Sequence, residues 1–182
     1  MKLYFDIDTQ IDFMFPAGAL YVPGAEKLLP RIGTLNRQAI AEGGKVISTT
    51  CAHEEDDAEF RQWPPHCVIG TAGQTKAASL LLEKRVIVPK SPSSLSLDGA
   101  DQIVLEKGEL NLFTNPNTEE LIRRLNPEEC LVYGVVTEYC VRECALGLLQ
   151  RGYKVTLVQD AMQCLDAAAA ERFLREFAGI DA

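Results

Sequence analysis

Three side chains suited to nucleophilic chemistry each follow a separate apolar segment of the sequence. Asp8 ends the segment of residues 2–8, Lys107 follows residues 102–106, and Cys140 follows the run of residues 131–136. A cysteine becomes nucleophilic when a base takes its proton and a nearby cation stabilises the thiolate. Asp8 can accept the proton and Lys107 can supply the charge. If the three meet, they predict a site for covalent catalysis by cysteine.

The position of Cys140 in the chain supports this interpretation. Residues 131–136 are a continuous apolar run, which is typical of a strand buried on both faces of a parallel sheet. From Cys140 the apolar residues recur at helical spacing until Gly152. A thiol at the N-terminus of a helix has a lowered pKa because unpaired N–H groups face it. The alternative is a packing role, since free cysteines are often buried in protein cores.

Asp8 and Lys107 also have ordinary alternatives. An aspartate after a strand often caps a loop, and a lysine is usually a solvated surface charge. In a parallel sheet, however, ligands bind beyond the carboxyl ends of the strands. Asp8, Cys51, Lys107 and the turn before Cys140 all fall at such ends. We therefore expect them to converge.

The long segment of residues 51–74 contains side chains that bind transition metals. Cys51, His53, Glu59 and His66 are the candidate ligands, and further carboxylates lie between them. Their spacing is not that of a zinc finger, and a histidine in such a loop is often only a surface side chain. We expect both histidines in the loop, away from the strand ends. A loop of this length in a compact domain is usually functional or disordered, and its aromatic residues favour a function.

Alternating strands and helices must position these side chains. Strands are expected at residues 2–8, 45–50, 85–88, 102–106, 131–136 and 154–159; helices are expected at 25–42, 75–83, 118–125 (capped by Asn117, with Glu120 completing a capping box), from 140 to 152, and at 167–177. This alternation implies right-handed crossovers and a mostly parallel sheet covered on both faces. Residues 1–182 are predicted to form a single domain.

Composition excludes several classes of function. The net charge of −8, without clustered lysine or arginine, disfavours nucleic acid and anionic membranes as partners. No apolar run approaches the length of a membrane span, and we see no signal peptide, so a cytoplasmic location is the expectation. The six cysteines form no CxxC pair and are predicted to be free thiols.

Four separated blocks resemble the isochorismatase-like cysteine hydrolases, and within them the nicotinamidases. The blocks are DTQ-DF with P-GAL in residues 8–20, WPPHC with GT-G in residues 63–73, EKG in residues 106–108, and GVVTEYCV in residues 134–141. Their order matches the family, and the resemblance runs from the first strand to about residue 160.

The resemblance implies a three-layer α/β/α sandwich and a catalytic trio of Asp8, Lys107 and Cys140. In this family the thiolate adds to a carboxamide carbonyl, ammonia leaves after protonation through the aspartate, and water resolves the thioester. The backbone N–H groups of Val136 and Cys140 would hold the oxyanion, with a cis peptide between Val135 and Val136. The resemblance also implies a dimer or tetramer.

The substrate and metal sites are implied with departures from the family. Phe13 and Trp63 resemble the aromatic walls around a pyridine ring, while Tyr139 stands where some members have histidine. Nicotinamidases hold zinc or iron with an aspartate and two or three histidines. Here His53 and His66 match, but Cys51 replaces the aspartate and Glu59 a further histidine. The remaining ligand types still suit a divalent ion, zinc above others.

The leading interpretation is therefore a nicotinamidase-like amidohydrolase with a small-molecule amide as substrate. A second keeps the trio and changes the substrate to another carboxamide, a ureido compound or an isochorismate-type vinyl ether. The third is a non-catalytic binding protein on the same fold, against which the intact trio argues.

Overall fold

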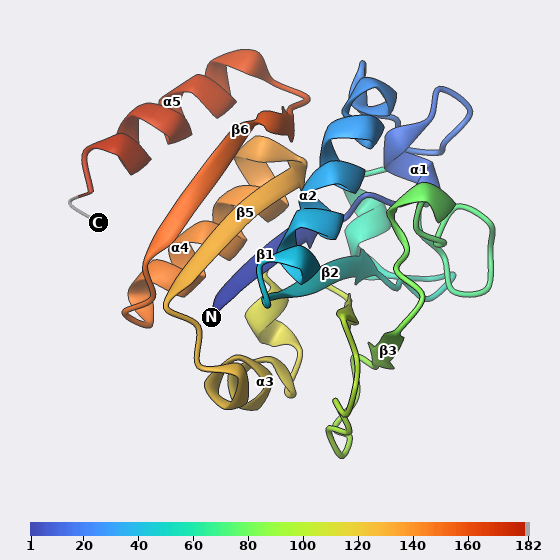
Figure 1. Ribbon diagram of the computed structural model, residues 1–182. Helices are drawn as coiled ribbons and strands as arrows, with labels where there is room; N and C mark the ends of the chain where they lie inside the picture. Colours follow the sequence, from blue (N-terminus) through green and yellow to red (C-terminus); the bar gives the residue numbers. More distant parts are fainter. Residues whose placement is uncertain (181–182) are drawn as a thin grey trace.

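Apolar segments of four to nine residues form one six-stranded sheet in which all strands run parallel. The computed structural model describes residues 1–180. The strands are β1 (Lys2–Ile7), β2 (Lys45–Cys51), β3 (Arg85–Val88), β4 (Gln102–Lys107), β5 (Glu129–Val135) and β6 (Val155–Gln163). Their spatial order is β3-β4-β2-β1-β5-β6 (Figure 1). The predicted parallel sheet is confirmed, and its central strands are buried on both faces.

Helices cover both faces of the sheet. The α-helices are α1 (Ile11–Met14), α2 (Leu29–Ala41), α3 (Thr118–Leu125), α4 (Arg142–Gln150) and α5 (Ala167–Ala178). Four short 3-10 segments are η1 (Ala25–Leu28), η2 (Ala58–Arg61), η3 (Ala78–Leu80) and η4 (Leu112–Thr114). A π-helical turn, η5, spans Thr137–Val141. Helix α2 packs against β1 and β2, and α4 packs against β5 and β6 from the opposite side (Figure 1). The three-layer sandwich is thus confirmed. Among residues 1–180, none of the helices has the length and apolarity needed to cross a membrane.

The end of β5 approaches the end of β1 very closely. Gly134 has a φ of 116°, and a Cβ added there would lie 2.3 Å from the carbonyl oxygen of Ile7. Only glycine tolerates both the backbone conformation and the contact. This close approach brings the segment after β5 next to Asp8, which follows β1 directly.

The prediction of a helix at residues 75–83 is wrong. The structure contains only the short 3-10 segment η3 there, because the preceding backbone pairs with the chain after β1. Ile11 N–H donates to Thr75 O at 2.9 Å, Ala77 N–H donates to Thr9 O at 3.2 Å, and Gln10 and Lys76 form an antiparallel bridge. A contact between segments so far apart in sequence leaves no local periodic signal.

The capping box at the start of α3 is also wrong, although the helix has the predicted bounds. The Asn117 side chain instead accepts a hydrogen bond from Ser93 N and donates to Pro89 O and Ser91 O. Glu120 pairs with arginines one turn further along the helix. The Asn117 side chain therefore anchors the loop after β3 and does not cap the helix.

The helix predicted to start at Cys140 begins differently. Cys140 lies within the π-helical turn η5, and regular α-helix starts only at Arg142. Such wide turns are uncommon and occur frequently at functional sites. In addition, β6 continues four residues beyond the predicted end at Gln159, past a register shift against β5.

Candidate active site

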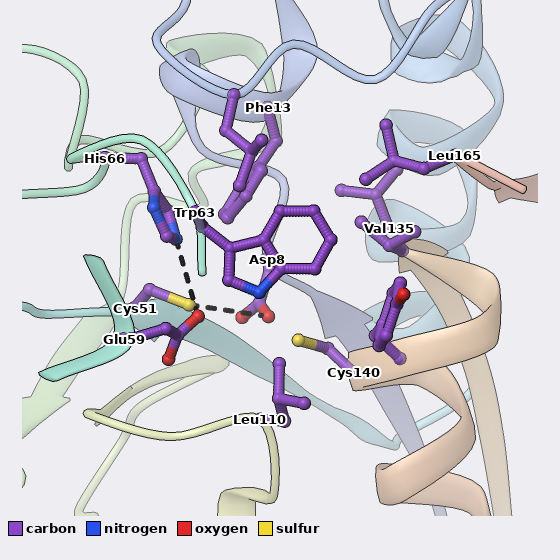
Figure 2. Close-up of a pocket in the computed structure, with 13 residues that line it drawn as sticks. Asp8, Phe13, Cys51, Glu59, Trp63, His66, Leu110, Val135, Cys140 and Leu165 are labelled. Carbon is purple, nitrogen blue, oxygen red and sulfur yellow. Dashed lines mark hydrogen bonds and ion pairs between the residues drawn. The ribbon is translucent and has the colours of Figure 1, made fainter. Parts of the chain in front are cut away.

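Asp8, Lys107 and Cys140 lie together at the carboxyl ends of β1, β4 and β5. Lys107 Nζ is 2.9 Å from Asp8 Oδ2 and 3.6 Å from Cys140 Sγ. All three are buried, with at most 6% of each residue exposed. Figure 2 shows the thiol of Cys140 and the carboxylate of Asp8 facing the same space. The structure thus brings the predicted trio together, with an ion pair at its centre.

Asp8 is held as a carboxylate by its neighbours. The residue has a φ of 48°, and Thr49 Oγ1 both donates to its Oδ1 at 2.6 Å and accepts from its backbone N–H at 3.1 Å. Burial alone would raise the pKa of Asp8, but the charge of Lys107 and hydrogen bonds from Thr49, Lys107 and Cys140 hold it below its usual 3.8. Asp8 is therefore a base with a defined orientation.

Lys107 stays protonated although it is buried. Burial would lower its pKa, but the negative charge of Asp8, followed by the two nearby sulfurs, raises the pKa well above its usual 10.5. Its ammonium also donates to Glu109 O at 3.0 Å. Lys107 thus supplies a fixed positive charge beside both the base and the thiol.

Cys51 is the fourth member of this group. Its sulfur lies 3.1 Å from Lys107 Nζ and 3.7 Å from Asp8 Oδ2. A hydrogen bond from Cys140 lowers the pKa of Cys51 to about 6, and the same bond raises the pKa of Cys140 well above its usual value. The shared hydrogen bond therefore favours the proton on Cys140, so the lowered pKa expected there from its place before a helix is wrong.

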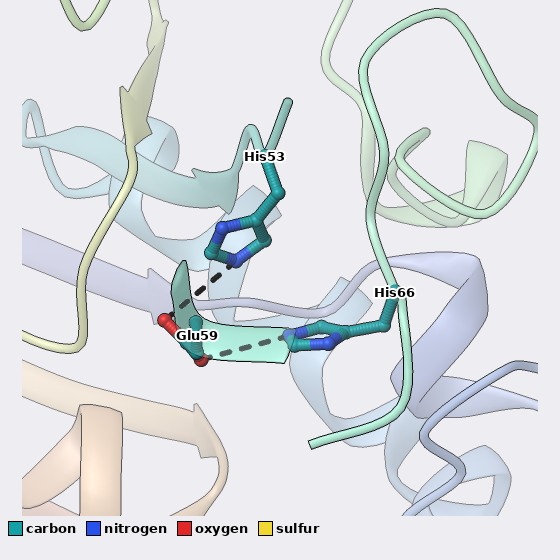
Figure 3. A group of neighbouring side chains, drawn as sticks. All are labelled: His53, Glu59 and His66. Atoms are coloured by element: carbon teal, nitrogen blue, oxygen red, sulfur yellow. Dashed lines mark ion pairs between the residues drawn. The ribbon is translucent and has the colours of Figure 1, made fainter. Parts of the chain in front are cut away.

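The predicted metal ligands divide into two sets. His53, Glu59 and His66 present ligand atoms within 4.8 Å of one another (Figure 3). The sulfur of Cys51 is not in that group and contacts Lys107 and Asp8 instead. Its role as a ligand stays a prediction.

The three grouped side chains fit a divalent transition-metal ion. His53 Nδ1 is 2.9 Å from Asp57 Oδ2 and His66 Nδ1 is 2.9 Å from Pro64 O, so that each ring is oriented by its outer nitrogen. Both Nε2 atoms lie 3.8–3.9 Å from Glu59 oxygens, and His53 Nε2 is buried without a hydrogen-bond partner. Two imidazoles and a carboxylate directed at one point are a common zinc donor set.

The electrostatics of His53 reflect its neighbours. Burial would lower its pKa, but the neighbouring Cys51 and Asp57 raise it to about 9. The expectation that both histidines lie away from the strand ends is wrong. His53 N–H donates to Cys67 O, Ile69 N–H donates to His53 O, and the loop so folded returns His66 to the end of β2.

An apolar pocket opens above Cys140. The substrate-binding residues predicted from the sequence, Phe13, Trp63 and Tyr139, all line it. Trp63 and Tyr139 meet edge to face, with ring centroids 5.5 Å apart. The remaining lining residues are Asp8, Leu20, Cys51, Glu59, His66, Leu110, Val135, Val136, Cys140 and Leu165 (Figure 2). A mostly apolar cavity with a few polar groups at its base suits a flat, neutral molecule.

Several residues of the site have roles that the sequence interpretation missed. Asp12 accepts hydrogen bonds from Ala19 N–H and Cys67 N–H, and therefore joins two loops that line the pocket. A Cβ at Gly73 would collide with that carboxylate. Both Asp12 and Gly73 belong to the blocks that carry the resemblance, which was the available signal. Thr49, Leu110 and Leu165 had no such signal.

The peptide bond between Val135 and Val136 is cis, as the resemblance implied. It lies directly before the turn that contains Cys140. The backbone N–H groups of Val136 and Cys140 stay the predicted oxyanion donors.

Comparison with known proteins places these observations in a wider group. A family model described as an isochorismatase domain matches residues 4–180. A nicotinamidase of Saccharomyces cerevisiae is 22% identical over 88% of this chain and 87% of its own length. A nicotinamidase/pyrazinamidase of Mycobacterium tuberculosis is 26% identical over 97% of this chain and 94% of its own. The crystal structure of a Pyrococcus horikoshii pyrazinamidase in complex with zinc is 28% identical, with a TM-score of 0.83, and the match covers 97% of this chain and 94% of that one.

Proposed function

The chain belongs to the isochorismatase family of hydrolases, and on that premise we propose that it converts nicotinamide or a similar small carboxamide to the acid and ammonia. The observation that carries the proposal is the position of Lys107 Nζ, 2.9 Å from Asp8 Oδ2 and 3.6 Å from Cys140 Sγ. Both Asp8 and Cys140 line the aromatic pocket. Base, cation and nucleophile are thereby assembled where a substrate carbonyl would lie.

The reaction begins with attack by Cys140. Its sulfur adds to the carboxamide carbon while the thiol proton passes to Asp8, whose lowered pKa keeps it ionised and ready to accept. The carbonyl oxygen becomes an oxyanion, and the N–H groups of Val136 and Cys140 stabilise it. Lys107 keeps Asp8 oriented and offsets the negative charge that moves through the site.

The intermediate then releases ammonia. Asp8 returns its proton to the amide nitrogen, the C–N bond breaks, and a thioester on Cys140 remains. Asp8 next takes a proton from water, and the oxygen of that water attacks the thioester. The C–S bond breaks, the acid leaves, and Cys140 recovers its proton.

His53, Glu59 and His66 would hold a divalent metal ion, for which we propose zinc, with Cys51 as a further ligand. When bound, the ion would supply a Lewis acid at the edge of the pocket that orients polar atoms of the substrate. The zinc in the Pyrococcus horikoshii pyrazinamidase supports this assignment.

Aromatic amides should be better substrates than aliphatic ones. Phe13 and Trp63 offer flat apolar surface, so nicotinamide should exceed butyramide in kcat/KM by at least about tenfold. Ammonia release measured over both amides, with and without added zinc, checks this. Trp63→Leu should reduce the preference, and Phe177→Leu, in α5, should leave it unchanged. Equal turnover of the two amides would exclude the aromatic pocket as the basis of recognition.

Protein purified without chelators should contain about one metal ion per chain, because the donor set is preformed. Mass spectrometry of the elements in the purified protein measures this. Glu59→Gln should lower the occupancy, whereas Glu55→Gln, on an exposed residue of the same loop, should not. If the wild-type protein holds no ion and does not bind added zinc, the site is not a metal site.

A further inference from the structure

The connection between β6 and α5 contributes one side of the pocket. It consists of residues 164–166, and Leu165 is the residue of this connection that lines the pocket. Leu165 is 36% exposed, which is unusual for a large apolar side chain in this protein. Figure 2 shows it at the rim, across the pocket from Trp63 and above Val135. Its position makes it a boundary for any ring bound over Cys140.

Glu138 fastens this connection to the turn that holds the nucleophile. Its Oε1 accepts hydrogen bonds from Leu165 N–H at 2.9 Å and from Asp166 N–H at 2.6 Å. Glu138 lies two residues before Cys140 within η5 and is only 8% exposed. The residue that borders the pocket is therefore held by a residue of the nucleophile's own turn.

Further contacts fix the two ends of the connection. Thr137 Oγ1 donates to Gln163 O at 3.0 Å, and the Asp166 side chain caps α5 by accepting from Ala168 N–H and Ala169 N–H. Gln163 Nε2 also donates to Pro23 O, in the loop that carries Leu20. Between these fixed ends, the bonds to Glu138 Oε1 are what set the position of the Leu165 backbone.

The hydrogen bonds to the connection are those that the Glu138 carboxylate makes. Its other oxygen, Oε2, is buried and has no hydrogen-bond partner among residues 1–180. A buried carboxylate oxygen is costly unless the group makes strong hydrogen bonds elsewhere. The two backbone N–H groups are the donors that offset this cost, and a side chain without an acceptor oxygen would leave both of them unpaired.

We propose that Leu165 is a specificity-determining residue that limits the width of the substrate ring, and that Glu138 is the positioning residue that holds Leu165 in place. This inference rests on the proposed amide hydrolysis. A monocyclic amide fits between Leu165 and the aromatic walls, and a fused bicyclic amide meets the leucine side chain. Removal of that side chain widens the pocket at this point only.

The test compares kcat and KM for nicotinamide and for the bicyclic quinoline-3-carboxamide. Leu165→Ala should raise KM for nicotinamide about tenfold, with a much smaller change in kcat, because a binding contact is lost. The ratio of kcat/KM for the bicyclic amide to that for nicotinamide should rise about tenfold or more. Ile87→Ala, on the exposed edge strand β3, is the matched control and should leave the ratio unchanged.

Variants of Glu138 test whether this residue positions Leu165 or only stabilises the fold. Glu138→Gln keeps an acceptor oxygen and should retain the wild-type ratio, whereas Glu138→Ala should shift it in the same direction as Leu165→Ala. In the double variant the ratio should equal that of Leu165→Ala. If Glu138 acts through Leu165, the effects of the two substitutions do not add. Circular dichroism of each variant reports whether it is folded.

Two results would overturn the inference while leaving the proposed function intact. One is an unchanged ratio in Leu165→Ala with normal turnover of nicotinamide. The other is a double variant whose effects add, which would mean that Glu138 does not act through Leu165. If the wild-type protein releases ammonia from neither amide, the proposed function itself fails and this inference fails with it.

Discussion

Cys140→Ala should lower the rate of ammonia release from nicotinamide about 10⁴-fold or more, because loss of the nucleophile leaves only binding and oxyanion stabilisation. Cys140 is the thiol that lies 3.6 Å from Lys107 Nζ and lines the pocket together with Asp8. A coupled assay for ammonia under saturating amide measures the effect on kcat. The variant should remain folded, since alanine only shortens a side chain at the pocket base.

Two other cysteine variants act as controls for that result. Cys164→Ala changes a half-exposed thiol outside the pocket and should have wild-type activity. Cys51→Ala should lower activity less than Cys140→Ala, because Cys51 contacts the trio and borders the metal group without receiving the acyl group in this mechanism. If Cys140→Ala kept its activity and Cys51→Ala lost it, the nucleophile would be Cys51 and the mechanism proposed here would be wrong.

Asp8→Asn should reduce kcat about 10³-fold or more, because the amide cannot accept the Cys140 proton and return it to the leaving nitrogen. It should also destabilise the fold by about 3 kcal/mol, since Lys107 loses its buried countercharge. Thr49→Val removes both hydrogen bonds between the Thr49 hydroxyl and Asp8 but keeps the carboxylate; it is the matched comparison and should cost much less in both respects. Near-normal turnover by Asp8→Asn would show that Asp8 is not the base of the reaction.

The pH dependence of stability provides a second measurement on Asp8. Its folded pKa lies below the unfolded 3.8, so its contribution is present above that pH and lost as pH falls through the folded pKa. Lys107 has a folded pKa above 10.5, so its contribution is lost only as pH rises through that value. The difference in unfolding free energy between wild type and Asp8→Asn should therefore be constant near neutral pH and shrink below about pH 4.

The sequence predicted those parts of the site that depend on local pattern and on parallel topology. Residues 131–136 read as a buried strand, and the rule that strand ends converge placed Asp8 and Lys107 beside the turn with Cys140. The observed six-stranded parallel sheet agrees with that topology. Phe13, Trp63 and Tyr139, which only the family resemblance implied as substrate-binding residues, line the pocket.

The parts that sequence could not predict depend on contacts between distant segments. His53 reaches the site because its backbone pairs with residues 67–69, and the residues near Thr75 do not form a helix because they pair with residues 9–11. Neither pairing has a periodic signature of its own. Leu165 and Glu138 were missed for the same reason: the hydrogen bonds that join them span 27 residues and two secondary-structure elements.

The most direct test of the central claim is the location of the acyl group during turnover. Protein mixed with excess nicotinamide and quenched in acid is digested with trypsin, which places Cys51 in residues 46–61 and Cys140 in residues 125–142. Fragmentation distinguishes Cys140 from Cys130 in the second peptide. The mechanism predicts a nicotinoyl thioester on Cys140 that disappears when the substrate is exhausted. An acyl group on Cys51, or rapid ammonia release without any acylated peptide, would contradict it.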